Sequence, residues 1–498
     1  MDTPILAAQA PSDHSILGTP EQKRPLNDLP PDARRVAAAA RAHRRLMRRG
    51  ATVAIGQAGS ASMHTHAGIV GGLLIAAVAA VSSTLPESAG YGPHPQLPPP
   101  KPQTIPTIKI APTRPWSGAE TPQAAAGFAV NEFARNLAHP RMLYVLPNGD
   151  VLVAETDTPE KPQDYKGIKG TVMKFEQRRA GAGHGSANRL TLLRDADANG
   201  VAETQTVFLQ GLNSPYGMSL VGDSLYVANT DSLVRVPYHA GETKVTVMPT
   251  RIAGLPGGPI NHHWTKNLVA SRDRRHLYVS VGSNSNAGEN GIEAETDRAS
   301  ILEVDPSTGK TRVYASGLRN PVGLAWQPDS GALWTSVNER DELGDDLVPD
   351  YMTSVHDGAF YGFPYSYYGA HLDPRVQPAR PDLAATAQMP DYALGAHTAS
   401  LGLVFYDGDA FPQRYRGGAF VGQHGSWNRS QASGYKVVFV PFDHGKPSGA
   451  AEDILTGFLD AQGNARGRPV GVAVDRHGAL LVADDVGGRV WRVTSTVK

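Results

Sequence analysis

A phrase of about 20 to 28 residues recurs six times along the chain, and this repetition limits the fold more than any other feature. Each copy joins a turn rich in Pro or Gly, a few apolar residues, a polar turn and a short strand-like run that ends in polar residues. The copies begin at His139, Asn213, His262, Leu318, Leu401 and Gly467. Equivalent apolar positions lie roughly 50 to 90 residues apart, the spacing of four-stranded blades with variable loops. The sequence therefore predicts an all-β, six-bladed β-propeller.

Composition supports short strands joined by many turns. The chain has 53 Gly and 39 Pro among its 498 residues, and Gly and Pro favour turns over long helices. Residues 151–154 and residues 437–440 form short apolar runs, as strands do. No apolar period of 3.6 residues is sustained through the repeated phrases, which argues against a helical repeat.

Charge and cysteine content exclude several classes of function. The 47 basic side chains equal the 47 acidic ones, so no overall field attracts the protein to nucleic acid, and no base-reading motif is present. The chain has no cysteine. Disulfides, thiolate metal sites, cysteine nucleophiles and covalently attached haem are therefore excluded. Any redox chemistry needs a cofactor that is held without sulfur.

The first 85 residues differ in composition from the rest. No acidic residue occurs between Ala33 and Pro86, and seven arginines lie within residues 34–49. We interpret residues 1–66 as a basic tail, which an over-extended gene start would also explain. Residues 67–85 hold an apolar stretch of about 15 residues that suits a secretory signal peptide or a membrane anchor. Both readings predict a periplasmic or otherwise exported protein, and the second adds association with the inner membrane.

A proline-rich segment, residues 86–124, follows. It holds 11 prolines in the 37 residues from Pro86 to Pro122. Proline favours extended polyproline conformations and removes backbone donors. We expect this segment to be a linker between the N-terminal region and a propeller domain formed by residues 125–498.

Polar residues recur at the ends of the strand-like runs. In a propeller these ends meet at one mouth of the central channel, beside the starts of the innermost strands. They also cap strands in any propeller, so a structural role competes with a functional one. The residues concerned are Glu155, Asn229, Ser283, Asn284, Asn338 to Asp341, Gln423, His424, Asp484 and Asp485.

Histidine and arginine residues open several copies at the same mouth. His262 and His263 are adjacent, so at most one of them faces the channel axis if they lie on a strand. Arg319 and Asn320 open the fourth copy, and Arg468 opens the sixth. A general base next to fixed cations is the arrangement that a small polyanionic ligand and a proton-transfer reaction require.

Six motifs in fixed order identify a resemblance. They are HHWTKNL, GLRNPVGLAW, NERDELGDDLVPDY, YGFPY, HGSWNRS and GRPVGVAVD, spread between Phe133 and Val493. In these motifs the chain resembles the soluble sugar dehydrogenases that depend on pyrroloquinoline quinone (PQQ), and most of all their L-sorbosone dehydrogenase-like branch. The resemblance implies a six-bladed propeller with PQQ across the channel mouth, a bound calcium ion, and a sugar or aldehyde substrate.

The resemblance also implies residue roles. His263 falls on the family's catalytic base, and Arg319 and Asn320 fall on the pair that contacts the quinone oxygens. Arg468 matches the first arginine of an Arg-x-Arg pair that binds PQQ carboxylates, whereas Val470 replaces the second.

Two further matches are looser. Arg429 lies near the position of a lysine that contacts PQQ in the family. Asp341 and Glu342 stand where the family offers Gly-Pro carbonyls to calcium. Their carboxylates are suitable calcium ligands, but the family's ligand pattern does not transfer directly. The loop Tyr361 to His371, rich in aromatic residues, is expected to influence substrate choice, although packing explains its rings equally well.

A second cation motif lies between the first two copies. Asp195, Asp197, Asn199 and Gly200 match the D-x-[DN]-x-[DN]-G opening of a calcium loop, and Glu203 stands at its ninth position. The loop is a candidate structural calcium site. A plain hairpin turn stabilised by Asx side chains is the alternative.

The leading hypothesis is an exported PQQ-dependent sugar or aldehyde dehydrogenase, with L-sorbosone or an aldose as the substrate type. Without a haem-attachment motif, its electrons must pass to a separate quinone or cytochrome. A propeller lactonase with a metal-activated water is one alternative, with ligands drawn from Glu155, Asn229, Asn284 and Asp484. A ligand-binding propeller without catalysis is the other, and it gains support from Val470 and the altered calcium loop.

Overall fold

The computed structural model describes residues 84–103, 106–159, 167–181, 183 and 185–497. The basic tail 1–66 and nearly all of the expected signal or anchor segment 67–85 lie outside the described residues. Among the described helices, none has the length and hydropathy needed to cross a membrane.

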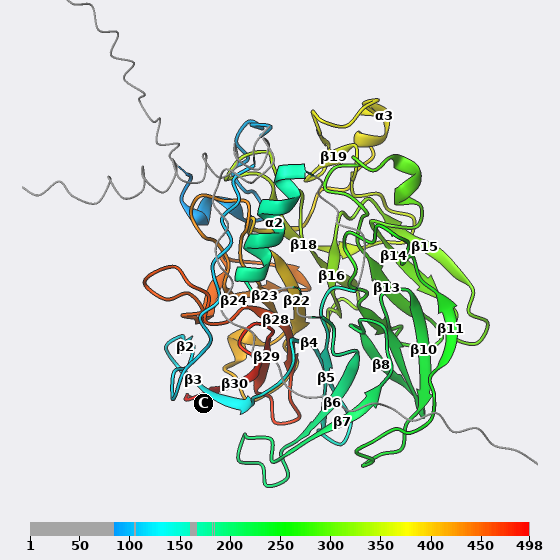
Figure 1. Ribbon diagram of the computed structural model, residues 1–498, viewed down its shortest axis with the longest axis vertical. Coiled ribbons are helices and arrows are strands. Elements are labelled where there is room, and N and C mark those ends of the chain that lie inside the picture. Colours follow the sequence, from blue (N-terminus) through cyan, green and yellow to red (C-terminus); the bar gives the residue numbers. More distant parts are fainter. Residues whose placement is uncertain (1–83, 104–105, 160–166, 182, 184, 498) are drawn as a thin grey trace, which may run out of the picture. The chain divides into compact units, whose positions relative to one another are not determined.

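Six antiparallel sheets of the propeller account for most of the described chain, which confirms the predicted fold (Figure 1). The first three blades have four strands each. Blade 1 contains β4 (Pro140–Val145), β5 (Val151–Glu155), β6 (Arg189–Arg194) and β7 (Thr204–Gln210). Blade 2 contains β8 (Met218–Val221), β9 (Ser224–Ala228), β10 (Ser232–Pro237) and β11 (Thr250–Gly254). Blade 3 contains β12 (Leu268–Ala270), β13 (Leu277–Val281), β14 (Ser300–Val304) and β15 (Thr311–Ser316).

The last three blades recruit strands from the N-terminal part of the chain. Blade 4 contains β16 (Pro321–Trp326), β17 (Leu333–Val337), β18 (Pro349–Val355), β21 (Tyr392–Ala396) and β1 (Tyr91–Gly92). Blade 5 contains β22 (Ser400–Phe405), β23 (Ala419–Gln423), β24 (Lys436–Val440), β27 (Glu452–Thr456) and β2 (Gln123–Ala124). Blade 6 contains β28 (Pro469–Val474), β29 (Leu480–Asp484), β30 (Arg489–Ser495) and β3 (Phe128–Ala134).

Strand β3 closes the ring. It pairs with β30, so a strand that precedes blade 1 in sequence forms the outer strand of blade 6. The innermost strands contact one another in a cycle, including β28 against β4. Figure 1 shows several of them, among them β4, β16, β22 and β28, gathered around the middle of the molecule. Closure leaves the inner strands without free edges.

The smaller elements lie in the loops. They are α2 (Gly167–Arg179), α3 (Pro381–Ala384), the 3₁₀ turns η2 (Glu87–Gly90), η3 (Ile292–Glu295) and η4 (Gln413–Tyr415), and the hairpins β19 (Ser366–Tyr367) with β20 (His371–Leu372) and β25 (Phe442–Asp443) with β26 (Lys446–Pro447). Helix α2 interrupts the connection between β5 and β6 of blade 1 and was not predicted from the sequence.

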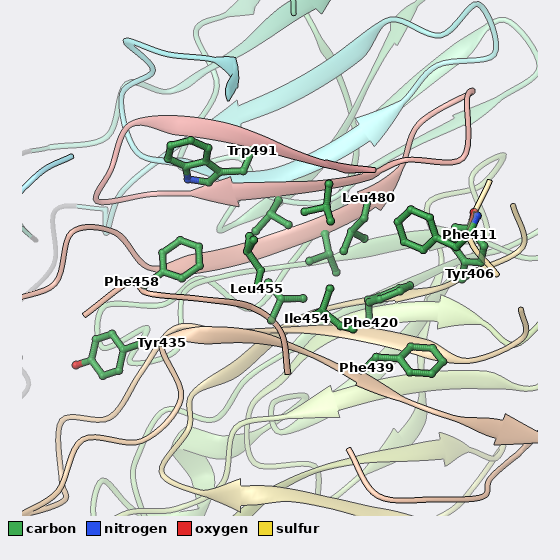
Figure 2. Close-up of a cluster of buried hydrophobic side chains, with 14 of the residues drawn as sticks. Tyr406, Phe411, Phe420, Tyr435, Phe439, Ile454, Leu455, Phe458, Leu480 and Trp491 are labelled. Atoms are coloured by element: carbon green, nitrogen blue, oxygen red, sulfur yellow. The ribbon is translucent and has the colours of Figure 1, made fainter. Parts of the chain in front are cut away.

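Apolar side chains between neighbouring blades form the core. Figure 2 shows the interface of blades 5 and 6, where Phe420 and Phe439 lie opposite Leu480. The Val437–Val440 run is completely buried, as expected for a strand covered on both faces. Full burial of one such side chain contributes about 1.5 to 3 kcal/mol. Packing between blades therefore holds the loops at the mouth in place.

The proline-rich segment is not a free spacer. It contains the 3₁₀ turn η2, and β1 pairs with β21 while β2 pairs with β27, so the segment adds fifth strands to blades 4 and 5. The expectation of a separating linker is corrected here. The reason is physical: between its prolines, the segment keeps N–H and C=O groups that bond to loops of the propeller.

Candidate active site

The starts of the inner strands and the ends of the second strands lie side by side at one end of the channel. The strand register pairs Pro140 with Glu155, and Pro469 with Asp484. We call this end the mouth. As predicted, His263, Arg319, Asn320 and Arg468 all occupy loops at the mouth.

His263 is held with one ring nitrogen turned into the protein. Its Nδ1 lies 3.0 Å from the carbonyl oxygen of Ser283 and 3.0 Å from the Oγ of the same residue. That Oγ donates its own proton to the carbonyl of Ser285, 2.7 Å away. Both atoms facing Nδ1 are therefore acceptors, so Nδ1 carries the hydrogen and Nε2 carries the lone pair.

The surroundings of His263 also keep it neutral. Burial lowers its pKa well below the usual value, and the electrostatic influence of His262 and the fixed positive charge of Arg319 add to the effect. Arg298 fixes the backbone by donating to the carbonyls of His263, at 2.8 Å, and Gly282, at 2.9 Å. His263 is consequently suited to accept a proton at Nε2.

Asn320 lies next to this histidine. A Cβ placed on Gly282 would come within 2.3 Å of Asn320 Oδ1 and 2.5 Å of His263 Cβ, so only glycine fits between them. The Oδ1 of Asn320 is buried and has no hydrogen-bond partner within the described part of the chain. An acceptor without a partner therefore lies beside the candidate base.

Arg319 is only 1% exposed and uses all five of its N–H groups within the protein. Nε donates to the Asn286 carbonyl at 3.1 Å, and Nη2 donates to Asn286 Oδ1 at 2.9 Å and to Asp341 at 3.3 Å. Nη1 donates to the carbonyls of Asn338 at 3.2 Å and Glu339 at 2.6 Å. A direct contact with a ligand would require one of these bonds to break. Arg319 therefore holds the loops of residues 286 and 338–341 together and supplies a fixed positive charge.

Asp341 does not present free oxygen atoms to a cation. Its side chain accepts from Arg319 and from His397 Nδ1, at 3.1 Å, and its carbonyl accepts from Asn286 Nδ2 at 3.2 Å. Burial opposes ionisation of Asp341, but His397 and Arg319 outweigh burial and lower its pKa. Asp341 is thus an anion that already has cationic partners.

Glu342 has the same limitation. Arg375 donates to Glu342 Oε2 at 2.7 Å, and the Glu342 carbonyl accepts from the Gln103 N–H at 3.0 Å. The donor set at Asp341 and Glu342 therefore does not fit the predicted calcium ion in this arrangement, and we route no chemical step through it.

Arg468 is buried, and within the described residues its guanidinium bonds only to carbonyl oxygens. Nη1 donates to His424 at 3.3 Å, Nη2 donates to Ala111 at 3.1 Å, and the guanidinium lies 4.8 Å from the ring centre of Tyr435. Its Nε has no partner, and no carboxylate pairs with the guanidinium among the residues that the structure describes. Arg429 differs, because its Nη2 pairs with Asp346 at 2.9 Å while its Nε has no partner among those residues.

Sequence reasoning did not assign a role to Arg141. It is the second residue of β4 in blade 1, one residue after Pro140, and the strand register makes it the counterpart of Val470 in blade 6. Its Nη1 donates to Asp485 Oδ2 at 2.6 Å, and His424 Nε2 lies 2.9 Å from the same oxygen. Only its correspondence to Val470 within the repeat could have identified it.

Asp485 is the anion at the centre of this group. It is 4% exposed, and although burial opposes ionisation, His424 and Arg141 outweigh burial and lower its pKa. Its Oδ1 has no partner within the described ranges. The Asp485 carboxylate therefore orients the Arg141 guanidinium and retains one free acceptor.

Val470, which replaces the second arginine of the family's Arg-x-Arg pair, has a packing role. It is completely buried in an apolar cluster with Tyr216, Val322 and Leu401. A Cβ added to the next residue, Gly471, would lie 2.5 Å from the Arg141 carbonyl, so the two inner strands touch here. Arg141 thus stands on the neighbouring strand, beside the position that a second arginine would occupy.

Comparison with known proteins places the chain in a family. Residues 122–358 and 379–496 match the family model described as TrAA12-like. This chain belongs to the TrAA12-like family. An uncharacterised protein of Borreliella burgdorferi is 29% identical over 299 residues, which cover 57% of this chain and 76% of that protein.

Named relatives of this family member include a pyrroloquinoline quinone-dependent pyranose dehydrogenase of Coprinopsis cinerea. It is 25% identical over 390 residues, covering 65% of this chain but only 50% of that protein. The solved holo form of the pyranose dehydrogenase PQQ domain from Coprinopsis cinerea aligns with a TM-score of 0.61 at 22% identity, covering 78% of this chain and 100% of that one. At this identity the structural likeness supports the fold alone.

Several polar strand-end residues of this TrAA12-like chain cap strands. Glu155 accepts from Arg189 through both carboxylate oxygens, at 2.9 Å each. Asp484 accepts from the indole nitrogens of Trp116 at 2.7 Å and Trp491 at 3.1 Å. Such residues are already bonded and are poor candidates for the lactonase metal ligands. The same holds for Asn229 and Asn284, whose side chains bond to neighbouring backbone groups.

The Asp195 loop lies at the opposite end of blade 1 from the mouth, between β6 and β7. Ligand atoms of Asp195, Asp197 and Glu203 lie within 4.8 Å of one another, and this is the one such group found among the described residues. The Asn199 N–H also bonds to Asp195 and Asp197 at 3.1 Å each. This geometry suits both a cation loop and an Asx turn, so calcium here stays a prediction.

The aromatic loop is mostly a packing element. Tyr361, Tyr367 and Tyr368 are buried in the core cluster of blade 4, and the Tyr361 hydroxyl donates to the Ser354 carbonyl at 2.6 Å. A cavity of about 390 Å³ opens nearby, lined by residues 287–293 without Asn290 and by residues 375–377. Arg375 connects this cavity to Glu342.

Proposed function

We propose that the chain is a PQQ-dependent dehydrogenase that oxidises a sugar or an aldehyde. The observation that carries the proposal is Arg468, a buried guanidinium at the mouth whose hydrogen-bond partners among the described residues are all carbonyls. A buried cation without an anionic partner is costly, so the site favours an anionic ligand. PQQ carries carboxylates, and the pyranose dehydrogenase relative is named as dependent on it.

The donor set supports a ligand with several carboxylate groups. Arg141, Arg429 and Arg468 each have a buried Nε–H without a partner in the described residues. Each such donor costs about 1 to 3 kcal/mol until an acceptor arrives. Carboxylate oxygens are the strongest acceptors for guanidinium groups. We infer that Arg468 and Arg141 hold the cofactor, with Arg141 supplying the cation that Val470 does not.

When bound, PQQ supplies the acceptor for the hydride that leaves the substrate carbon. His263 Nε2 takes the proton of the hydroxyl group of the sugar, or of the hydrated aldehyde, so one proton and one hydride leave the substrate together. The Ser283 oxygens hold the ring in the required tautomer. Burial, together with the fixed positive charge of Arg319, lowers the pKa of His263 and keeps the ring neutral and able to accept this proton.

The finer assignments belong to the same proposal. We propose L-sorbosone or an aldose as the substrate type, with the cavity beside Arg375 as the place where its hydroxyl groups enter. Electrons would leave to a separate quinone or cytochrome, since the chain has no cysteine for covalent haem. We also propose export to the periplasm through residues 67–85, as a signal or an inner-membrane anchor.

The test uses the full-length protein, with detergent if needed. Quenching of tryptophan fluorescence measures PQQ binding, and reduction of an artificial dye measures turnover with L-sorbosone, glucose and simple aldehydes. H263A should bind PQQ and lose dye reduction by at least about a hundredfold, the lower range for a general base. H262A is the matched control and should retain most of the activity.

Folded wild-type protein that fails to bind PQQ would refute the proposal. In that case a ligand-binding propeller becomes the better reading, a reading that the fully bonded Arg319 also favours. Hydrolysis of lactones without cofactor would instead support the lactonase.

A further inference from the structure

Residues 106–116 run along loops of blades 5, 6 and 1 at the mouth, although they precede the matched family region, which starts at residue 122. We call these residues the strap. The strap passes the loop that follows β23 of blade 5, then the start of blade 6, and then the end of helix α2. Figure 1 shows the blue to cyan segment that precedes β3 running beside α2, as the hydrogen bond from Thr113 to Arg179 requires.

The first part of the strap is attached to blade 5. Lys109 N–H donates to the Trp427 carbonyl at 2.8 Å, and Asn428 Nδ2 donates to the Thr107 carbonyl at 2.8 Å. Lys109 Nζ donates to the Ser430 carbonyl at 2.6 Å. These loop residues belong to the HGSWNRS motif, which contains the predicted cofactor contact Arg429.

The second part is attached to blade 6 and to α2. The Ala465 N–H donates to the Pro112 carbonyl and the Arg114 N–H donates to the Ala465 carbonyl, both at 2.7 Å. Thr113 N–H donates to the Arg179 carbonyl at 2.9 Å. Trp116 is buried in the core, edge-on to Trp491 at 5.3 Å. The strap is therefore anchored at both of its ends.

One strap contact reaches the candidate cofactor site directly. The Ala111 carbonyl accepts a hydrogen bond from Arg468 Nη2, and Ala111 itself is buried. This contact fixes the orientation of a guanidinium whose Nε has no partner in the part of the chain that the structure describes. The strap also contains Lys109 and Arg114 but no acidic residue, so it brings no charge that would repel an anion.

We propose that the strap is a wall of the cofactor site: it orients Arg468 through the Ala111 carbonyl, and bound PQQ enters or leaves only when the strap detaches. This inference rests on the proposed function. It assigns a role in cofactor retention to a segment that lies outside the matched family region.

A reversible lock tests the inference, because the chain has no native cysteine to interfere. Thr113 and Ala465 are bridge partners, which places them at a separation suited to a disulfide. In the full-length T113C/A465C protein, we expect PQQ release to be about tenfold or more slower in the oxidised form than in the reduced form. Stopped-flow fluorescence after dilution into apo-protein acceptor gives the release rate.

The matched control places a disulfide just after the strap in the sequence. Gln123 and Thr456 pair between β2 and β27, so a Q123C/T456C disulfide leaves residues 106–116 free. We expect equal PQQ release from its oxidised and reduced forms. A loosening variant, K109A, removes the bond to Ser430 and should speed release severalfold, whereas K446A on exposed β26 should not.

The outcomes separate the two proposals. If PQQ binds but leaves the oxidised and reduced T113C/A465C proteins at the same rate, with disulfide formation verified by mass, the strap inference is wrong and the proposed function stands. If wild-type protein binds no PQQ, the proposed function fails, and the strap inference fails with it.

Discussion

Replacing Trp116 tests whether the strap is anchored as the structure indicates. Its indole N–H donates to Asp484 Oδ2 at 2.7 Å, inside a buried cluster. A hydrogen bond to a carboxylate contributes about 1.5 to 3 kcal/mol. Asp484 would keep its other donors, among them Trp491 and the Arg468 N–H, so W116F loses one bond rather than the whole network.

Trp334 is the matched control. It is 2% exposed against 6% for Trp116, but its indole nitrogen has no hydrogen-bond partner in the described part of the chain. W116F and W334F remove similar volumes from buried sites, so the volume cost is similar in both. We therefore expect W116F to be less stable than W334F by about 1.5 to 3 kcal/mol.

The assay compares thermal midpoints by circular dichroism and guanidinium midpoints by fluorescence. For a chain of this size the difference corresponds to roughly 2 to 4 °C in thermal midpoint. W116F should also release PQQ faster than W334F does, because it weakens the end of the strap. A W116F midpoint equal to or above that of W334F would refute the anchoring of residues 106–116.

Four other predictions follow from the site. Because burial lowers the pKa of His263, the base stays neutral as the pH falls, and dye reduction should hardly change between pH 8 and 6; a histidine with the usual pKa would lose about three quarters of its neutral form by pH 6. G282A should lower kcat at least about tenfold by displacing Asn320 and His263, whereas G258A, with open space around its Cβ, should not. R141Q should weaken PQQ binding by about tenfold or more in a fluorescence titration, and R141K by less. Calcium should raise the thermal midpoint of wild-type protein but not of D195N; an unchanged wild-type midpoint would identify the loop as a plain hairpin turn.

The blade architecture could be predicted because apolar side chains recur along the sequence at the spacing of blades. The equivalent apolar positions taken from the repeat all lie in second strands, namely Leu152 in β5, Leu225 in β9, Leu277 in β13, Leu333 in β17, Phe420 in β23 and Leu481 in β29. The mouth followed from the same register, since polar strand ends and inner-strand starts are paired. Alternation and burial act locally, so a single sequence reveals them.

The strap could not be predicted for a physical reason. Its contacts use the carbonyls of Thr107, Ala111 and Pro112 and the N–H groups of Lys109 and Thr113. Every residue carries such groups, so they leave no signature in the sequence. Proline content indicated an extended chain, and it did not indicate what that chain would bind.

The hydrogen-bond partners of individual site residues could not be predicted from the sequence either. Arg319 was matched to a ligand contact, but its donors are used by Asn286, Asn338, Glu339 and Asp341, which only the folded loops bring together. Asp341 and Glu342 were likewise expected to bind calcium, but in the structure their carboxylates are bonded to Arg319, His397 and Arg375. Residue type identifies which chemistry a side chain can do, while its neighbours decide whether the side chain is free to do it.

Arg468 links the strap to the cofactor site in both directions. The Ala111 carbonyl and a bound carboxylate would use different N–H groups of the same guanidinium, so each fixes the orientation that the other needs. A coupling of this kind is reciprocal: strap docking raises the affinity for PQQ by the same factor by which PQQ stabilises the docked strap. Backbone amide exchange at Lys109 and Thr113 should therefore slow on PQQ binding, and a variant that loosens the strap should lose affinity and this protection in equal measure.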